Sequence, residues 1–482
     1  MKKHEGLIVT KENDFHEWYN QLIIKGKLIH YYDVSGCYVL LPNSYAVWES
    51  IQKYLDAEFK LRGVKNAYFP LFITKENLNK ESTHIEGFKP EVAWVTQAGD
   101  SKLEEPIAIR PTSECAIYPI LPSLIKSYND LPMKLNQWCS VVRWEFKDAT
   151  PFIRSREFLW NEGHSCFNNT DNAMVEVNDI IKLYQKTYSD LLAVPTIIGK
   201  KTDKERFCGA VSTLTIETFI PFANKGVQAA TAHCLGDNFS KIFNIIFNDT
   251  DMKNKHVIQN SWGFTTRSIG IMLMLHSDNK GVVFPPKVAP TQIVIVPIIN
   301  KKSNDIVMDY ATKIYENLKT SFRVEMDTRS HTPGWKYNYW EMNGTPIRIE
   351  VGPNDVKNSM VTVCRRDTGE KLEVRSENIE QMMDIILNKI HNNLYEVAYN
   401  KLMSSIEQPS SLDEMTKLFE SQNKLCLMNW CGDLKCEEYF KDKYKAKSLC
   451  IPLELNLPFK KIDKCLICDN DGKELCLFGK SF

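Results

Sequence analysis

One segment, between residues 141 and 164, constrains the fold of this 482-residue chain more than any other. The run Val141-Val-Arg-Trp-Glu-Phe146 has the composition of a strand, and a second strand-like run, Arg154-Ser-Arg-Glu-Phe158, follows a loop rich in turn-forming residues. Side chains two residues apart share one face of a strand, so Arg143 and Glu145 point the same way. The segment therefore predicts an antiparallel hairpin with a polar face.

The second strand extends this face, because Phe158, Trp160, Glu162 and His164 again alternate with period two. One sheet surface would then carry a cation suited to a phosphate, a carboxylate suited to an amino group and aromatic rings suited to a base. Polar residues at this spacing are also common in ordinary surface hairpins, and such a hairpin is the alternative interpretation.

Two further segments extend the pattern. A helical stretch at 46–60 leads into Leu61-Arg-Gly-Val-Lys-Asn-Ala-Tyr-Phe-Pro70, which ends at a proline as strands often do. Later, Asn260-Ser-Trp-Gly-Phe-Thr-Thr-Arg-Ser-Ile-Gly270 leads into an apolar run at 271–275. Arg267 would open an apolar helix, and a buried arginine needs an anionic partner.

Together these segments resemble the three signature motifs of class II aminoacyl-tRNA synthetases, which bind ATP on an antiparallel sheet. Three more strings resemble the prolyl-tRNA synthetases of that class: Ile109-Arg-Pro-Thr-Ser-Glu-Cys115, Gln228-Ala-Ala-Thr-Ala-His233 and Pro333-Gly-Trp-Lys336. The resemblance runs from about residue 5 to the C-terminus. It favours the archaeal and eukaryotic type, because only about a hundred residues separate His164 from Arg267 and leave no room for a large editing insertion.

The resemblance implies roles for the polar face in binding ATP. Arg143 is expected to bridge the α-phosphate of ATP and the carboxylate of proline, and it is the one residue expected to be catalytic. Glu145 is expected to accept a hydrogen bond from the adenine amino group, and Arg154 to hold the outer phosphates. The remaining predicted ATP contacts are Phe158 and Arg267 on the two faces of adenine, and Gln228, Thr231 and Thr265 around the ribose and phosphates; Gln228 is also expected to contact Mg²⁺.

The resemblance also implies a binding site for L-proline. Thr112 and Glu114, two residues apart in a turn, match the two hydrogen-bond donors of a secondary ammonium. His233 is expected near the proline carboxylate, with Trp160 and His164 as walls of the ring pocket. The chain departs from the family in two places. Alanine stands at 229, 230 and 232, where the family often has glycine or serine, and the chain ends in Phe482, where the family usually has tyrosine.

The expected fold class is α+β, in three domains. Residues 1–290 are predicted to form the class II catalytic domain, built on an antiparallel sheet. Alternating strands and helices at 291–400 predict an α/β domain with largely parallel strands, which the resemblance makes the anticodon-binding domain. Residues 401–482 are predicted to form a small zinc-binding α/β domain. In the anticodon-binding domain, Glu350 could accept hydrogen bonds from guanine or serve only as a charge that stabilises the fold.

The last segment is rich in cysteine. Cys431 and Cys436 form one close pair, and Cys465 and Cys468 form a second. Two such pairs provide the four thiolates that a structural zinc ion prefers, and four protein ligands leave no open position for a reacting water. The alternative is a set of buried free thiols, which is the expected state of the remaining cysteines in a reducing compartment.

Composition and charge bear on the partners and the compartment expected for this chain. Lys and Arg together number 60, as do Asp and Glu, so the overall charge gives no sign of a nucleic-acid partner. The N-terminus lacks the apolar core of a signal peptide, and no apolar run is long enough to cross a membrane. We expect a cytoplasmic homodimer that uses ATP, Mg²⁺ and structural Zn²⁺ and acts on L-proline and tRNA(Pro), without a membrane partner.

Other interpretations remain open at this point. A threonyl, seryl, histidyl or glycyl enzyme would share the class II motifs, although a threonyl enzyme would need a Cys/His/His zinc set in its catalytic domain and the Thr112–Glu114 turn favours proline. An inactive paralogue that binds tRNA or has a regulatory role is a second alternative. The presence of Arg143, Glu145, Arg154 and Arg267 argues against it. A piece of a larger fused synthetase is a third.

Overall fold

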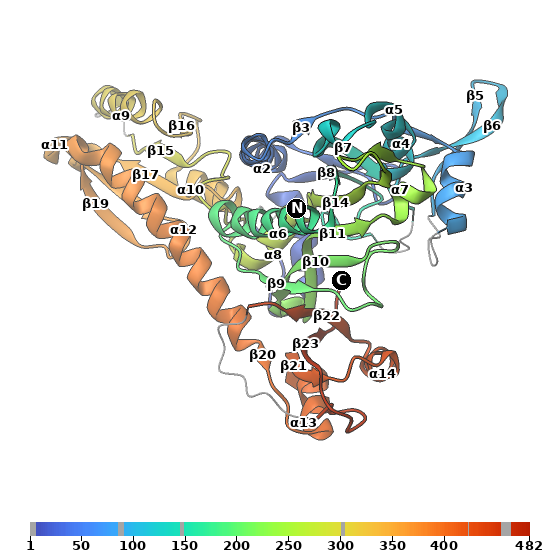
Figure 1. The fold of residues 1–482 in the computed structure, drawn as a ribbon. Coiled ribbons are helices and arrows are strands. Elements are labelled where there is room, and N and C mark those ends of the chain that lie inside the picture. Colours follow the sequence, from blue (N-terminus) through green and yellow to red (C-terminus); the bar gives the residue numbers. More distant parts are fainter. Residues whose placement is uncertain (1–5, 85–90, 145–148, 300–303, 423, 455–463) are drawn as a thin grey trace.

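The computed structural model describes residues 6–84, 91–144, 149–299, 304–422, 424–454 and 464–482. Its centre is an eleven-stranded sheet in the order β20-β21-β23-β22-β9-β10-β11-β14-β8-β7-β3 (Figure 1). The strands are β3 (Lys65–Asn66), β7 (Met133–Val142), β8 (Glu157–Phe167), β9 (Ile197–Lys200), β10 (Ser212–Ile220), β11 (Lys225–Gly236), β14 (Ile258–Thr265), β20 (Ile406–Glu407), β21 (Leu425–Trp430), β22 (Lys447–Pro452) and β23 (Glu474–Gly479).

The catalytic part of this sheet is antiparallel from β9 to β7, as predicted, and only the short β3 joins it in parallel. One face packs on α6 (Thr170–Leu192), with α2 (Pro42–Leu61) and α8 (Arg267–His276) beside it. Along each strand, side chains point alternately to the two faces of the sheet. Trp262 and Phe264 of β14 pack in the apolar core under α6, while their neighbours on the strand face the opposite side.

The predicted hairpin exists, but its first strand ends earlier and its second strand begins later than expected. Strand β7 ends at Val142, and β8 begins only at Glu157. The N–H of Val142 donates to Arg110 O at 3.1 Å, so the chain leaves the sheet by pairing with another loop. Arg143 thus lies just beyond the strand end, although its N–H still donates to Arg156 O at 2.7 Å. Glu145 lies outside the described residues.

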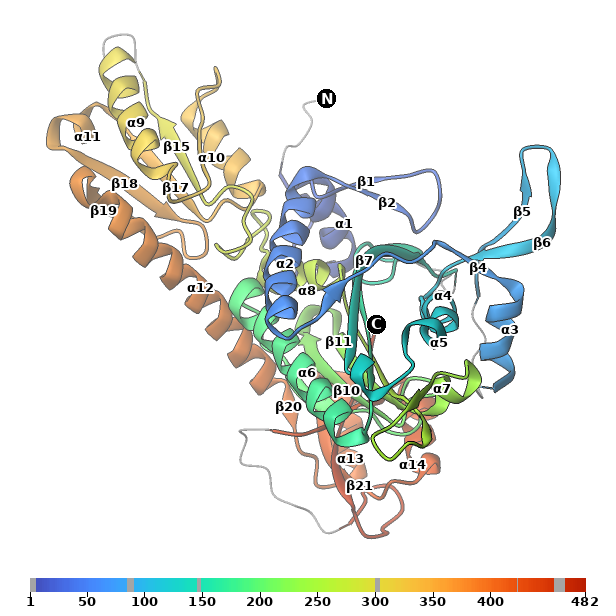
Figure 2. The ribbon, with the colours of Figure 1, turned by 45° about the horizontal axis from the view of Figure 1, so that its top comes forward.

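Smaller elements surround the catalytic sheet. Two hairpins, β1–β2 and β12–β13, and the three-stranded sheet β4-β6-β5 lie at its margins. Their bounds are β1 (Ile29–Tyr31), β2 (Tyr38–Leu40), β4 (Phe72–Thr74), β5 (Trp94–Ala98), β6 (Ser101–Ile109), β12 (Ile246–Asn248) and β13 (Asn254–His256). The accompanying helices are α1 (Phe15–Lys25), α3 (Lys75–His84), α4 (Glu114–Ile117), α5 (Leu121–Leu124) and α7 (Asn238–Ile242). The β5–β6 hairpin projects from the body (Figure 2).

The second unit is built on a separate five-stranded sheet in the order β16-β15-β17-β18-β19. Its elements are β15 (Ile293–Pro297), α9 (Asn304–Leu318), β16 (Val324–Met326), α10 (Pro333–Met342), β17 (Ile347–Val351), α11 (Pro353–Asn358), β18 (Met360–Arg365), β19 (Lys371–Arg375) and α12 (Ile379–Ser404). The prediction of largely parallel strands was wrong for half of the sheet, because β17, β18 and β19 pair antiparallel. The connection from β18 to β19 is too short for the crossover that parallel strands need.

Helix α12 runs from this second unit toward the C-terminal unit (Figures 1 and 2). The C-terminal unit contains α13 (Leu412–Lys417), α14 (Leu434–Tyr444) and strands β20 to β23. Strand β22 pairs with β9, with Ile451 opposite Lys200 and Pro452 opposite Gly199. The strands of the C-terminal unit therefore extend the catalytic sheet.

The C-terminus also docks on the catalytic sheet. Gly226 of β11 donates its N–H to Lys480 O at 2.7 Å and accepts from the N–H of Phe482 at 3.2 Å. The ring of Phe482 packs against the main apolar core, and Lys225 Nζ lies 4.7 Å from its centroid. The last residues thus contact the start of the strand that carries Gln228 and Thr231.

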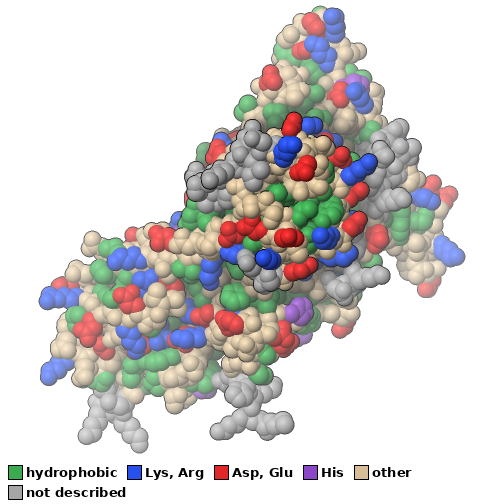
Figure 3. All heavy atoms as spheres, turned by 90° about the horizontal axis from the view of Figure 1, so that it is seen from below, with side chains coloured by type: hydrophobic (Ala, Val, Ile, Leu, Met, Phe, Trp, Pro, Cys, Tyr) green, Lys and Arg blue, Asp and Glu red, His purple; other side chains and the backbone are tan. Residues whose placement is uncertain are grey.

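The surface carries both signs of charge. On the face in Figure 3, basic and acidic side chains are interspersed and neither sign forms a continuous face of its own. Among the described helices, none combines the length and apolar character that a membrane crossing requires.

Candidate active site

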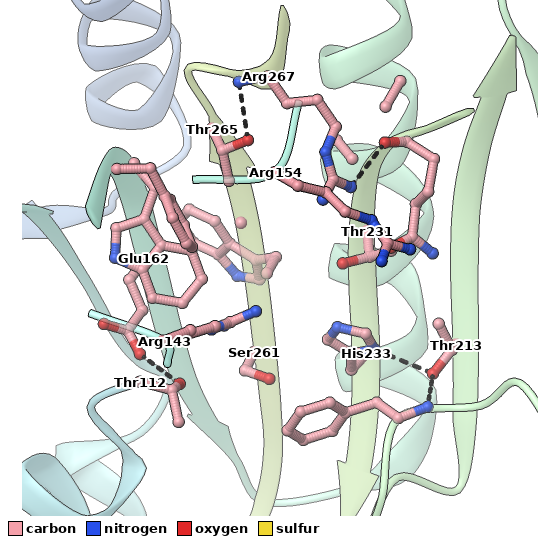
Figure 4. A pocket seen from close by; sticks show the side chains of 18 of the residues that line it. Thr112, Arg143, Arg154, Glu162, Thr213, Thr231, His233, Ser261, Thr265 and Arg267 are labelled. Carbon is pink, nitrogen blue, oxygen red and sulfur yellow. Dashed lines mark hydrogen bonds between the residues drawn. The ribbon is translucent and has the colours of Figure 1, made fainter. Parts of the chain in front are cut away.

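The face of the catalytic sheet opposite α6 carries a cavity of about 290 Å³ (Figure 4). Its walls come from β8, β10, β11 and β14, from the turn before α4, from the loop between β7 and β8, from the segment after β9 and from the start of α8. Every predicted proline or ATP contact within the described residues lines it: Thr112, Glu114, Arg143, Arg154, Phe158, Trp160, His164, Gln228, Thr231, His233, Thr265 and Arg267. Glu145 cannot be placed, because it lies outside the described residues.

Three arginines give one part of the cavity its positive charge. Arg143 donates from Nε to Pro111 O at 3.0 Å, and its guanidinium lies 5.4 Å from the rings of both Phe158 and Trp160. Arg267 donates to Ile153 O at 3.0 Å and to Gln228 O at 3.1 Å. Burial lowers the pKa of Arg267, and the charges of Arg143 and Arg154 lower it further. Cations that repel one another across a cavity favour the binding of an anion between them.

The opposite part of the cavity is acidic. Glu162 accepts from the Ser113 N–H at 2.6 Å and from Thr112 Oγ1 at 3.0 Å, and its Oε1 lies 3.0 Å from His164 Nε2. Thr112 Oγ1 also donates to Glu114. The two carboxyl groups and the imidazole are buried among one another.

Burial and the neighbouring charges separate the pKa values of this acidic group. Burial raises the pKa of Glu114, and the Glu162 charge adds to the effect. Burial also opposes ionisation of Glu162, but hydrogen bonding to His164 and Ser113 lowers its pKa overall. Burial opposes the charge on His164, yet Glu162 and Glu114 raise the imidazole pKa. The arrangement places hydrogen-bond acceptors and negative charge where a ligand ammonium could bind.

His233 is held differently. Thr213 Oγ1 lies 2.9 Å from its Nδ1, and the ring of Phe207 stands 4.7 Å from its own ring (Figure 4). Burial lowers the pKa of His233 to about 3, so the imidazole is neutral near pH 7. It can therefore offer one hydrogen bond into the cavity without adding a charge.

Several cavity residues carried no motif in the sequence. Glu162 belonged to the predicted period-two face but was given no binding role, although it organises the acidic side. Glu205 and Phe207 come from an irregular segment after β9, and Thr213 is the second residue of β10. No periodicity marks an irregular segment, and only the fold brings it to the cavity.

The predicted cysteine cluster assembles in the C-terminal unit. The Sγ atoms of Cys431, Cys436, Cys465 and Cys468 all lie within 4.8 Å of one another, and Cys431 Sγ is 3.6 Å from those of both Cys436 and Cys468. Four thiols converging from a loop, a helix and a turn are the donor set that suits zinc. The other metal-capable group among the described residues, Glu114, Glu162 and His164, contains no cysteine and a single histidine. It is therefore not the Cys/His/His set that a threonyl enzyme would need.

In the second unit, the residues near Glu350 pair with one another. Arg348 donates to Glu350 at 2.9 Å, and Lys371 donates to the same carboxylate at 3.1 Å. Lys336 Nζ donates to Asp327 O at 2.8 Å. Glu350, only 7% exposed, therefore already has partners for its carboxylate inside the fold.

Comparison with known families agrees with this geometry. Residues 94–276 match the family described as the tRNA synthetase class II core domain (G, H, P, S and T). Residues 292–386 match the anticodon binding domain, and residues 412–482 match the prolyl-tRNA synthetase C-terminal domain. The fold and the cavity are thus those of a class II aminoacyl-tRNA synthetase.

Individual relatives show which family of class II synthetases this chain resembles. The chain is 45% identical to the cytoplasmic proline–tRNA ligase of Arabidopsis thaliana, covering 99% of this chain and 91% of that one. It is 42% identical to the proline–tRNA ligase of Clostridium novyi, covering 100% and 99%. A crystal structure of prolyl-tRNA synthetase from Cryptosporidium parvum, complexed with halofuginone and AMPPNP, superposes with a TM-score of 0.94 at 44% identity and covers 100% of this chain and 98% of that one. The chain belongs to the prolyl-tRNA synthetase family.

The extent of these matches also bears on the type of enzyme. The expected archaeal and eukaryotic type is supported by the eukaryotic relatives, and the Clostridium novyi match shows that bacteria hold similar chains. The chain also spans 29–33% of the length of bifunctional glutamate/proline–tRNA ligases.

Proposed function

We propose that this chain ligates L-proline to tRNA(Pro), first activating proline with ATP to prolyl-adenylate and then transferring the prolyl group to the 3′ end of the tRNA. The observation that carries the proposal is the division of one cavity into a side with three arginines and a side with two buried carboxyl groups. Such a cavity suits a ligand pair with phosphates at one end and an ammonium at the other. We take proline as the amino acid because the relatives are named proline–tRNA ligases.

The first step joins two anionic groups, since the proline carboxylate attacks the α-phosphate of ATP. The protein must therefore neutralise charge and hold the two groups in line, and it needs no covalent nucleophile. Arg143 donates to Pro111 O, next to Thr112 of the acidic side, and its charge acts on Arg267, so its planar guanidinium can contact both reacting groups. We assign it the catalytic role.

We assign the ATP site to the arginine side of the cavity. Phe158 and Arg267 would cover the two faces of adenine, and Arg154 would bind the outer phosphates. Gln228, Thr231 and Thr265 would frame the ribose and phosphates, with Glu145 on the adenine amino group. Gln228 would also contact Mg²⁺, which neutralises phosphate charge when bound. The Cryptosporidium parvum protein, whose crystal structure contains the ATP analogue AMPPNP, supports a nucleotide site in this fold.

We assign the proline site to the acidic side. Thr112 and Glu114 would accept hydrogen bonds from the secondary ammonium, and His164, ion-paired with Glu162, would close the pocket beneath it. Trp160 would flank the pyrrolidine ring. Neutral His233 would contact the carboxylate end without competing with Arg143 for charge.

The cysteine cluster would hold a structural zinc ion through Cys431, Cys436, Cys465 and Cys468. The donor set fits, because its four sulfurs converge within 4.8 Å of one another. Zinc bound there would stabilise the fold of the C-terminal unit and would have no part in the chemistry.

The remaining proposals concern partners and organisation. We propose a homodimer, three domains at 1–290, 291–400 and 401–482, and a cytoplasmic location like that in the name of the Arabidopsis thaliana relative. Helix α12 crosses the second of these boundaries. The second unit would read the tRNA anticodon, which matches its similarity to the anticodon binding domain.

Aminoacylation tests the proposal directly. Purified protein should attach radiolabelled proline to a tRNA(Pro) transcript when ATP and Mg²⁺ are present. Glu145→Ala should raise the KM for ATP and leave the KM for proline unchanged. Tight binding of tRNA(Pro) without any charging would support the inactive paralogue instead.

A further inference from the structure

The segment 201–207, which follows β9, forms part of the cavity wall. Glu205 and Phe207 line the cavity. The N–H of Phe207 donates to Thr213 Oγ1 at 3.2 Å, and Thr213 Oγ1 lies 2.9 Å from His233 Nδ1 (Figure 4). The Phe207 ring is also 4.7 Å from that of His233. The segment therefore contacts the imidazole of His233 directly through Phe207 and indirectly through Thr213.

The same segment is attached at its start to the C-terminal unit. Thr202 Oγ1 donates to Glu437 Oε1 at 2.9 Å, across 235 residues of sequence. Ser448 Oγ completes a triangle: it donates to Glu437 and lies 3.1 Å from Thr202 Oγ1. Thr202, Glu437 and Ser448 are each no more than 3% exposed. A buried carboxylate that loses a hydrogen-bond donor is costly, so this triangle fixes its members firmly.

Two further contacts join the same surfaces. Lys447 Nζ lies 2.8 Å from Glu205 Oε2, so a residue of β22 holds a residue of the cavity wall. Buried Lys201 Nζ donates to Leu449 O at 2.6 Å and pairs with Glu217 at 2.7 Å. Glu217 stands opposite Gln228 in the pairing of β10 with β11. The C-terminal unit thus contacts this segment at Lys201, Thr202 and Glu205.

The triangle also lies next to the cysteine cluster. Glu437 directly follows Cys436 in the first turns of α14. The position of Glu437 therefore depends on the same helical turn that brings Cys436 to the other three sulfurs. A change in the cluster would move the carboxylate that receives the hydrogen bond from Thr202.

We propose that Thr202 and Glu437 are positioning residues through which the C-terminal unit sets the geometry of the proline site. Neither residue lines the cavity; they act through the 201–207 segment on Phe207 and, through Thr213, on His233. The inference rests on the proposed function for its substrate. It gives the C-terminal unit a role in amino-acid activation, in addition to extending the catalytic sheet.

Three single variants of the full chain test this. Thr202→Val keeps the shape of the side chain and removes the hydroxyl, and Thr202→Ser restores the hydroxyl. Glu438→Gln is the matched control, because this neighbour of Glu437 is 60% exposed and its long ion pair with Lys204 of the same segment, at 3.6 Å, contributes little. In proline-dependent ATP–pyrophosphate exchange, Thr202→Val should raise the KM for proline about tenfold and change the KM for ATP by less than about twofold. Thr202→Ser and Glu438→Gln should match the parent chain.

Hydrogen–deuterium exchange supplies a readout that does not depend on activity. Amides of 203–210 should exchange faster in Thr202→Val than in the parent chain, and Thr202→Ser should restore their protection. Unchanged exchange in this segment, or an unchanged KM for proline, would overturn the inference while leaving the proposed function intact. Equal increases in both KM values would also overturn it. Absence of any proline-dependent exchange in the parent chain would instead refute the proposed function, and amide exchange alone would then decide whether the attachment exists.

Discussion

Replacing Arg143 with alanine removes the cation that lies between the two halves of the cavity. Its lost hydrogen bond to Pro111 O, at 3.0 Å, stabilises the folded state by only about 1 kcal/mol. Its expected contact with charge developing on the α-phosphate contributes about 3–4 kcal/mol to the transition state. The variant should therefore stay folded while adenylate formation falls by about 10²–10³-fold.

The assay is ATP–pyrophosphate exchange at saturating proline, together with the melting temperature and the affinity for tRNA(Pro). Arg143→Lys is the matched control, since it keeps the charge and loses the planar pair of donors. It should recover only part of the lost rate. Exchange in Arg143→Ala within about threefold of the parent chain would be far too small a loss for a transition-state contact and would refute the assignment.

Four other predictions address separate parts of the molecule. Glu114→Ala should raise the KM for proline far more than that for ATP, because it removes a buried acceptor from the proposed ammonium site. Equal changes in the two KM values would show that the Thr112–Glu114 turn only supports the fold. Purified protein should contain about one zinc per chain by elemental analysis, and Cys465→Ser should lose it and destabilise the C-terminal unit; a zinc-free parent chain would favour free thiols. Deleting Lys480–Phe482 should lower adenylate formation, since these residues bond to Gly226 at the start of β11, whereas Phe482→Tyr should change it little; full activity after the deletion would contradict this. Glu350→Ala should weaken tRNA charging but not pyrophosphate exchange. If the pairing of Glu350 with Arg348 and Lys371 instead serves the fold, thermal stability and exchange should fall together.

Local patterns predicted much of this structure. The period of two along β8 placed Phe158, Trp160 and His164 on one face, and the change from polar strand to apolar helix placed Arg267 at the start of α8. These predictions worked because a strand or helix fixes the direction of its side chains from sequence spacing alone.

Contacts between distant segments were not predictable in this way. The end of β7 depends on the pairing of Val142 with Arg110, and the extension of the sheet depends on the pairing of β22 with β9. The segment that carries Glu205 and Phe207 is irregular, and its contacts with the C-terminal unit join residues more than 200 positions apart. Such contacts are set by tertiary packing and leave no periodic signal in the sequence.

The central claim is that the two-sided cavity activates proline with ATP. The most direct measurement is ATP–pyrophosphate exchange by the full chain with each of the twenty amino acids supplied separately. We expect exchange with proline to be strong and to far exceed that with any other amino acid. Exchange driven by threonine or serine, with none driven by proline, would contradict the account.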